Sequence, residues 1–170
     1  HLSLRRQRQM CIRDRSYCFR KMDEGYDRGI RVEKRIVALD GSVIKELKRG
    51  EVYRVEVKVV APRARFFVVL DDPIPGGCEV VNERFLTEAV DVPGGGTIRY
   101  REEGFIHKDY CRDRVLAFAE VLPAGEHTFV YYIRPLVSGN FIIPPTVVKE
   151  VYTPEVFGST PPMSLSVSED

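Results

Sequence analysis

The sequence predicts an all-β fold, an antiparallel Greek-key β-sandwich. Eight or more apolar runs of strand length follow one another after residue 29, and most of them are closed by Gly or Pro. Short strands and turns at such regular spacing are typical of β-sandwiches. No segment of real length repeats its apolar residues with the period of a helix, which argues against a helical body.

At 170 residues the chain is large enough for one domain with a well-buried core. Its content of 44% hydrophobic and 30% charged residues is ordinary for a globular protein. The net charge of +1 provides no field that would attract nucleic acid or an anionic membrane. No apolar run approaches the roughly 20 residues of a membrane helix. We therefore expect no nucleic-acid partner and no membrane contact by this domain.

The first residues differ from the rest of the chain. Residues 1–20 hold seven Arg or His side chains against one acid, Asp14, and show no sustained periodicity. We interpret residues 1–24 as a disordered basic leader, or as a stretch that is not native to the protein, and assign it no function. Residues 25–170 are then a single β-sandwich domain.

The first strands alternate apolar and charged residues. Residues 30–39 do so in part and end at an Asp-Gly turn. The segment EVYRVEVKVV, residues 51–60, alternates apolar and polar positions over most of its length. This pattern predicts a strand with one buried face and one face toward water, the second carrying Arg54, Glu56 and Lys58.

Further along, residues 65–70 form a more continuous apolar run, which predicts a central strand. Residues 98–103 and 105–111 flank a glycine and predict a hairpin or a bulged pair. Residues 114–121 contain good helix formers. Their short length and the Pro-Ala-Gly turn at 123–125 nevertheless favour a strand.

The strongest strand signal is HTFVYYIRPLV, residues 127–137, which is rich in β-branched and aromatic residues. A second strand at 141–143 runs into the proline pair 144–145. Because proline cannot donate to a ladder, this pair predicts an edge or a corner where the chain crosses between sheets. Residues 146–152 and 164–167 complete the predicted strands.

Few residues could do chemistry. His107, Asp109 and Cys111 would project from one face of a strand, because side chains repeat every two residues. As a metal site they are incomplete, and as a thiol nucleophile with its base they have neither an orienting partner nor an oxyanion loop. The acid pair Asp71-Asp72 is of a kind common at turns and on strand faces toward water. We predict no catalytic residue, no metal and no cofactor; a hydrolase that uses His107 is an alternative.

Three charged residues stand in an apolar context: Asp113, Arg114 and Arg134. A buried or half-buried Asp–Arg pair would fix strand register or a loop through charge-assisted hydrogen bonds, so we assign them a structural role. Cys78 and Cys111 allow two interpretations. We favour two separate buried thiols; the alternative is a disulfide between strands or sheets in an exported protein.

Two segments together resemble the C-terminal domain of the bacterial α2-macroglobulins. The first is VVLDDPIPGGCEVVN, residues 68–82, whose strand and turn are similar to the family's Asp-x-Leu-Pro-Ala-Gly-x-Glu turn. The second, residues 112–155, carries RDR, LPAG, YIR, GNF, PP and YTPE in the family's order. With a weaker likeness over residues 28–60, the resemblance covers roughly residues 25–168.

The resemblance implies a non-catalytic macroglobulin domain, an immunoglobulin-like sandwich, of a bacterial protease inhibitor. Its parent would be periplasmic or extracellular, or tethered to a membrane through its N-terminus. In that family a protease cuts a bait segment, the molecule collapses around it, and an internal thioester captures it in many members. The thioester sequence Cys-x-Glu-Gln is absent from this chain. The implied partner is the thioester domain of the same polypeptide, with proteases as indirect targets.

In the family this domain packs on the thioester domain and keeps water from the reactive bond, using a methionine–tyrosine pair. Tyr152 matches the tyrosine, whereas Val151 replaces the methionine. These two residues are the candidate thioester-shielding site. The alternative function is a generic extracellular adhesion or carbohydrate-binding module on the same kind of sandwich.

Overall fold

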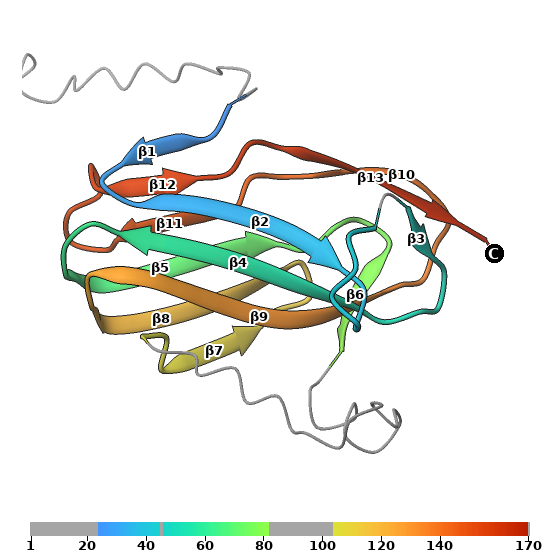
Figure 1. The fold of residues 1–170 in the computed structure, drawn as a ribbon, viewed down its shortest axis with the longest axis horizontal. Helices are drawn as coiled ribbons and strands as arrows, with labels where there is room; N and C mark the ends of the chain where they lie inside the picture. Colours follow the sequence, from blue (N-terminus) through green and yellow to red (C-terminus); the bar gives the residue numbers. More distant parts are fainter. Residues whose placement is uncertain (1–23, 45, 82–103, 170) are drawn as a thin grey trace, which may run out of the picture.

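The computed structural model describes residues 24–44, 46–81 and 104–169, which form thirteen β-strands and no helix (Figure 1). The strands are β1 (Tyr26–Arg28), β2 (Arg31–Val37), β3 (Leu47–Lys48), β4 (Tyr53–Ala61), β5 (Arg65–Pro73), β6 (Cys78–Val81), β7 (His107–Tyr110), β8 (Arg114–Leu122), β9 (Gly125–Pro135), β10 (Gly139–Ile143), β11 (Val147–Glu150), β12 (Phe157–Ser159) and β13 (Met163–Ser168).

The strands are arranged in three sheets. A six-stranded sheet has the order β1-β12-β11-β5-β8-β7, a four-stranded sheet the order β2-β4-β9-β6, and a three-stranded sheet the order β10-β13-β3. Every strand pairing in the described ranges is antiparallel except that of β13 with β3. In Figure 1 the strands β2, β4 and β9 cross in front of β5 and β8, as two layers of a sandwich. The predicted all-β antiparallel sandwich is confirmed.

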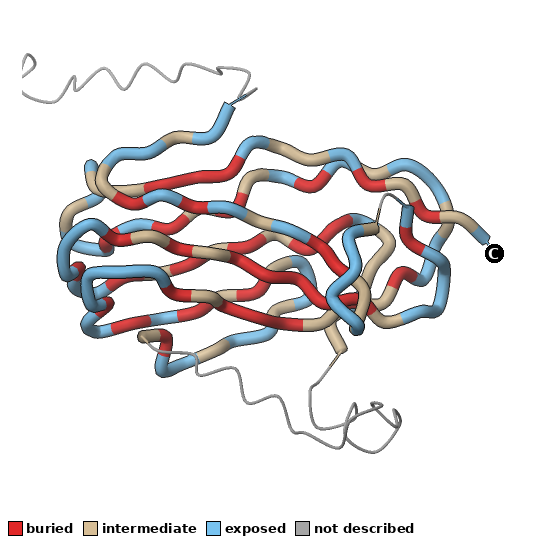
Figure 2. Tube along the Cα trace, viewed as in Figure 1, coloured by how far each residue is buried: buried red, intermediate tan, exposed pale blue. Residues whose placement is uncertain are grey.

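The core lies between the six-stranded and four-stranded sheets. Side chains from β4 and β9 meet side chains from β5 and β8 in one buried cluster. Figure 2 shows buried stretches along these strands. On β9, Phe129, Tyr131 and Ile133 all face inward and are fully buried. Each such side chain contributes about 1.5–3 kcal/mol by leaving water. The period-two pattern of the sequence therefore determines which side of β9 faces the core.

Other strand predictions are confirmed as well. The run at 65–70 becomes β5, which lies between β11 and β8 inside the six-stranded sheet. The helix-prone residues 114–121 form β8, because pairing of eight of its residues with β5 outweighs a weak helix propensity. The predicted hairpin lies only partly in the described ranges: β7 covers its second half, whereas residues 98–103, like the leader 1–23, lie outside them.

The proline pair at 144–145 marks a crossing between sheets, as predicted. β10 ends just before it in the three-stranded sheet, and β11 begins just after it in the six-stranded sheet. Proline has no N–H to donate, so it fits a segment that leaves one ladder before it joins another.

One prediction about β4 is wrong. Arg54 and Glu56, expected on a face toward water, are buried, with 9% and 5% of their surfaces exposed. β4 is an interior strand between β2 and β9, and the side chain of Arg35 on β2 lies against Glu56 on its outer face. Burial is tolerated because Arg54 Nη2 lies 2.8 Å from Glu56 Oε1 and Arg35 Nε donates to the same carboxylate. Lys58 is half-buried.

Candidate docking site

The chain leaves the six-stranded sheet after β11 and turns outward at Val151 and Tyr152. Both side chains are exposed, Tyr152 with 78% of its surface. The loop is held closed by two backbone hydrogen bonds, from Val156 N to the Thr153 carbonyl at 2.9 Å and from Glu150 N to the Val156 carbonyl at 3.1 Å. A large aromatic ring is therefore presented to water from a tightly hydrogen-bonded loop.

Phe67 on the neighbouring strand β5 contacts this loop twice. Its ring meets the ring of Tyr152 edge to face, with centroids 5.2 Å apart and planes at 86°. Its carbonyl accepts a hydrogen bond from Val151 N at 2.9 Å. Phe67 has a φ of 50°, in the left-handed region that bulky side chains rarely adopt.

The unusual backbone at Phe67 shifts the inward–outward alternation of β5. Val68 and Leu70 face the core, and Arg65, three residues before Val68, is also buried. Phe66 and Phe67 are consequently both exposed, at 56% and 51%. Two successive phenylalanines thus lie on the outer side of the sheet.

The inward–outward alternation of β8 shifts opposite the same part of β5. Ala119 and Leu122 are buried, and the two residues between them, Glu120 and Val121, are both exposed. Val121 is the register partner of Phe66. We call the exposed group formed by these neighbouring strands the apolar platform; its members are Phe66, Phe67, Val121, Val151 and Tyr152.

Beneath the platform lies a buried charged pair. Arg65 Nη2 donates to the Gly29 carbonyl at 2.6 Å, and its Nη1 lies 3.8 Å from Glu150 Oε1. The same Glu150 oxygen accepts from Phe66 N at 3.4 Å. These bonds join β5, β11 and the β1–β2 connection directly behind the exposed rings, which makes their support rigid.

The outer face of the four-stranded sheet has a different character. It carries exposed or half-exposed ion pairs, Arg31 with Glu33 at 2.7 Å and Lys58 with Glu126 at 2.9 Å. Charged faces of this kind stay in water at little cost, whereas a contiguous apolar patch is the usual mark of an interaction surface. The platform on the six-stranded sheet is therefore the candidate docking site.

The predicted structural charges lie elsewhere. Arg114, at the start of β8, pairs with Asp113 at 3.0 Å and with Asp71 at 3.1 Å, in a partly exposed setting. The hydrogen bond from Arg114 lowers the pKa of Asp113, and the same bond, with the nearby Asp71 charge, raises the pKa of Arg114. Arg134 on β9 lies 3.6 Å from Glu79 on β6.

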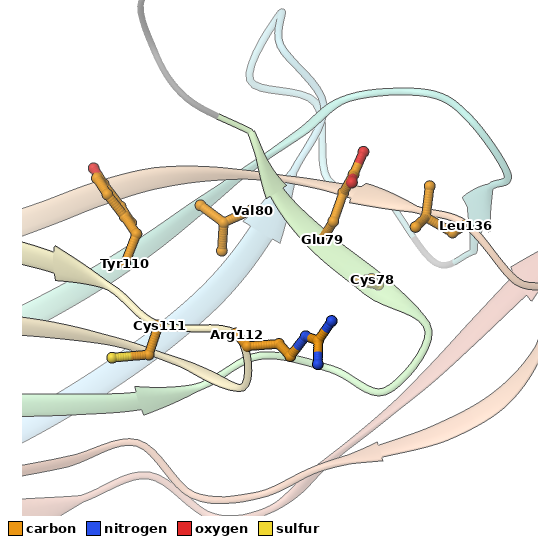
Figure 3. Close-up of a pocket in the computed structure, with 7 residues that line it drawn as sticks. All are labelled: Cys78, Glu79, Val80, Tyr110, Cys111, Arg112 and Leu136. Atoms are coloured by element: carbon orange, nitrogen blue, oxygen red, sulfur yellow. The ribbon is translucent and has the colours of Figure 1, made fainter.

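Cys78 and Cys111 line the same cavity, of about 510 Å³, between the turn after β7 and strand β6 (Figure 3). Both are free thiols, and in Figure 3 the sulfur of Cys111 points away from β6. Burial raises the pKa of Cys78 to about 11.

His107 lies on β7 beside Phe118, with ring centroids 6.1 Å apart. Within the described ranges no three His, Cys, Asp or Glu side chains lie close enough together to hold a metal ion.

Sequence reasoning missed one buried polar residue with several partners. Asp72, interpreted as an acid of a turn or of a strand face toward water, is fully buried and receives three bonds: from Lys34 Nζ at 2.6 Å, Thr146 Oγ1 at 2.7 Å and Tyr131 OH at 2.8 Å. Burial first, and then the Asp72 charge, raise the pKa of Tyr131 well above its usual value. The available signal was its position, since Asp72 begins the turn that resembles the family's Asp-x-Leu-Pro-Ala-Gly.

Comparison with known proteins places this geometry in a family. The model of the bacterial alpha-2-macroglobulin MG10 domain matches residues 29–155. An alpha-2-macroglobulin homolog of Nostoc sp. is 31% identical over 134 residues, which are 79% of this chain and 7% of the relative. The alpha-2-macroglobulin of Xylella fastidiosa is 25% identical over 118 residues, 66% of this chain and 7% of the relative. The chain therefore spans a small part of the curated relatives it matches.

Solved structures of bacterial alpha-2-macroglobulins superpose on this chain. Native alpha-2-macroglobulin of Escherichia coli, from domain MG7 to the C-terminus, superposes with a TM-score of 0.72 at 21% identity, over 84% of this chain and 24% of that chain. Salmonella alpha-2-macroglobulin reacted with methylamine superposes with a TM-score of 0.71 at 23% identity, over 85% of this chain and 10% of that chain. These structures share the fold. No helix in the described ranges is long and apolar enough to cross a membrane. The chain belongs to the bacterial alpha-2-macroglobulin MG10 domain family.

Proposed function

We propose that this domain is the non-catalytic C-terminal module of a bacterial alpha-2-macroglobulin-like protease inhibitor. It packs through the apolar platform on the thioester domain of the same polypeptide and shields the thioester until a protease cleaves the molecule. The observation that carries the proposal is the exposure of Tyr152, at 78%, in a loop that hydrogen bonds and the ring of Phe67 hold in place.

The physical requirement on such a site is exclusion of water and amines. A thioester persists only where neither can reach it, and an aromatic ring on a rigid strand can cover it and withdraw when the domain moves. The match covers only 7% of the Nostoc relative, so that protein has further domains on which such a module can pack. The Salmonella relative was solved after reaction with methylamine, an amine of the kind that attacks thioesters.

The rest of the proposal follows from the family. The parent protein is periplasmic or extracellular, or tethered to a membrane by its N-terminus, and proteases are its indirect targets. Asp113, Arg114 and Arg134 serve structure: Arg114 pairs with Asp113 and links the start of β8 to Asp71 on β5, and Arg134 links β9 to Glu79 on β6.

A carbohydrate-binding or adhesion module is the second candidate, favoured by the exposed aromatic residues alone. Sugars stack on a broad flat aromatic surface, whereas Phe67 and Tyr152 meet at 86° and present an edge between them. Binding in a glycan screen that is lost in Tyr152→Ala would establish this candidate in place of the first.

The test uses the full-length parent protein. Tyr152→Ala should speed spontaneous loss of the thioester, measured as free thiol released over time. Tyr110→Ala is the matched control, because Tyr110 is also an exposed tyrosine but lies on β7, away from the platform. A release rate that does not change in Tyr152→Ala, or that rises equally in both variants, removes Tyr152 from the mechanism.

A further inference from the structure

We propose that Phe67 is a positioning residue for Tyr152, and that its left-handed backbone builds the platform around it. The inference rests on the proposed function for its biological meaning, but the positioning itself can be measured without it. Apart from the strand predicted over residues 65–70, neither the sequence patterns nor the family resemblance assigns a role to Phe67.

The contact between the two rings is specific. Of the aromatic rings in the described ranges, Phe67 is the one that contacts Tyr152, at 5.2 Å and 86°. Edge-to-face geometry places the positive edge of one ring against the negative face of the other, so it favours one orientation. Because Tyr152 is largely surrounded by water, this contact and the bond from Val151 N to the Phe67 carbonyl determine where its ring points.

The backbone of Phe67 supports the same conclusion. In the described ranges Phe67 is the one residue other than glycine with a positive φ, 50°. Glycine would adopt this conformation without strain, so a phenylalanine here costs free energy. A strained residue on an exposed surface, whose ring contributes nothing to the core, indicates that the ring is needed where it lies.

The strain also shapes the surface. Because the alternation shifts at Phe67, Arg65 turns inward to Glu150, and the rings of Phe66 and Phe67 both turn outward beside Val121. Exposed charged residues adjoin the platform along the chain: Glu120 directly precedes Val121, and Lys149 lies two residues before Val151. An apolar centre with a charged rim fits a partner surface of the same design, an apolar patch surrounded by polar groups on the neighbouring domain of the parent.

The first experiment measures positioning in this chain. Biosynthetic labelling with 3-fluorotyrosine gives one ¹⁹F resonance for each of the eight tyrosines, and Tyr152→Phe identifies that of Tyr152. In Phe67→Ala this resonance should narrow and move toward the value of free fluorotyrosine. Phe67→Tyr, which keeps a ring, should leave it in place. Phe66→Ala, which removes the adjacent exposed ring, should also leave it in place.

The second experiment measures docking by hydrogen exchange in the full-length parent and in this chain. Peptides covering 65–69 and 150–153 should exchange several-fold more slowly in the parent, and Phe67→Ala in the parent should remove this difference, whereas Phe67→Tyr should keep it.

The outcomes separate the two proposals. A Tyr152 resonance that does not respond to Phe67→Ala overturns the positioning role. Protection in the parent that survives Phe67→Ala overturns the role of Phe67 in docking. If the resonance responds but the unmodified parent shows no protection, the proposed function fails while the positioning of Tyr152 by Phe67 stands.

Discussion

Lys34 and Asp72 form a fully buried ion pair, with Lys34 Nζ 2.6 Å from Asp72 Oδ1, across the two layers of the sandwich. Lys34 belongs to β2 in the four-stranded sheet, and Asp72 to β5 in the six-stranded sheet. Thr146 Oγ1 and Tyr131 OH complete the bonding of the carboxylate. The pair therefore sets one relative position of the two sheets, which apolar packing alone would specify less sharply.

Asp72→Ala should destabilise the fold by about 3–5 kcal/mol, because it leaves the Lys34 ammonium buried without its partner. The measurement is the free energy of unfolding from urea denaturation. Asp71→Ala, at the adjacent but partly exposed carboxylate, should have a much smaller effect. Equal losses in the two variants would show that the buried pair has no special role.

Phe67→Gly should unfold at higher urea concentration than Phe67→Ala, with a difference of about 1 kcal/mol in the free energy of unfolding. Both variants lose the ring, but only glycine adopts a φ of 50° without strain. If alanine is as stable as glycine at this position, the backbone strain assigned to Phe67 is absent in solution.

Gly158→Ala should destabilise the fold severely, because a Cβ there would lie 2.0 Å from the carbonyl oxygen of Ile30. The two nearest atoms belong to the Ile30 backbone, which cannot rotate away as the end of a flexible side chain could. Gly50→Ala is the informative comparison. Gly50 has a φ of 84° with open space around it, so only strain of about 1 kcal/mol is expected. Thermal unfolding of the two variants distinguishes the steric collision at Gly158 from the backbone strain at Gly50. Comparable losses of stability in both variants would contradict the packing at Gly158.

Cys78 should react slowly with iodoacetamide at neutral pH, because burial raises its pKa to about 11 and the thiolate is the nucleophile. Alkylation is measured by mass spectrometry in a variant with Cys11, Cys18 and Cys111 changed to serine. The rate should rise about tenfold per pH unit up to about pH 11. A plateau near pH 9 would show that Cys78 is not shielded.

The same pKa shift has a consequence for stability. The pKa of Cys78 is about 11 in the folded state against 9.0 for an unperturbed thiol, so between these values the folded state holds more protons. The contribution of Cys78 is therefore fully present below pH 9 and is lost as the pH rises toward 11. Urea denaturation across this window, with Cys78→Ser as the reference, measures it; identical pH profiles would contradict it.

The strands were predictable where local pattern and global burial agree. β4, β5 and β9 carry β-branched and aromatic residues at period two or in continuous runs, and their strand conformation follows from those patterns. Tyr152 and Val151 came from resemblance, because no local pattern distinguishes an exposed ring meant for docking from one at a rim. Phe67 was not predictable, since a phenylalanine with positive φ contradicts its own backbone preference.

Residue pattern and turn chemistry along the chain were enough to predict an all-β sandwich and the sheet crossing at 144–145, and the resemblance of its motifs indicated the family. Only the tertiary structure decided that Asp72 is buried with three hydrogen-bond donors around it, that Arg54 and Glu56 are buried, and that Phe67 lies against Tyr152. The alternation of apolar and polar residues indicates which residues share a face of one strand. Which neighbour covers that face depends on strands distant in sequence, and local pattern carries no record of them.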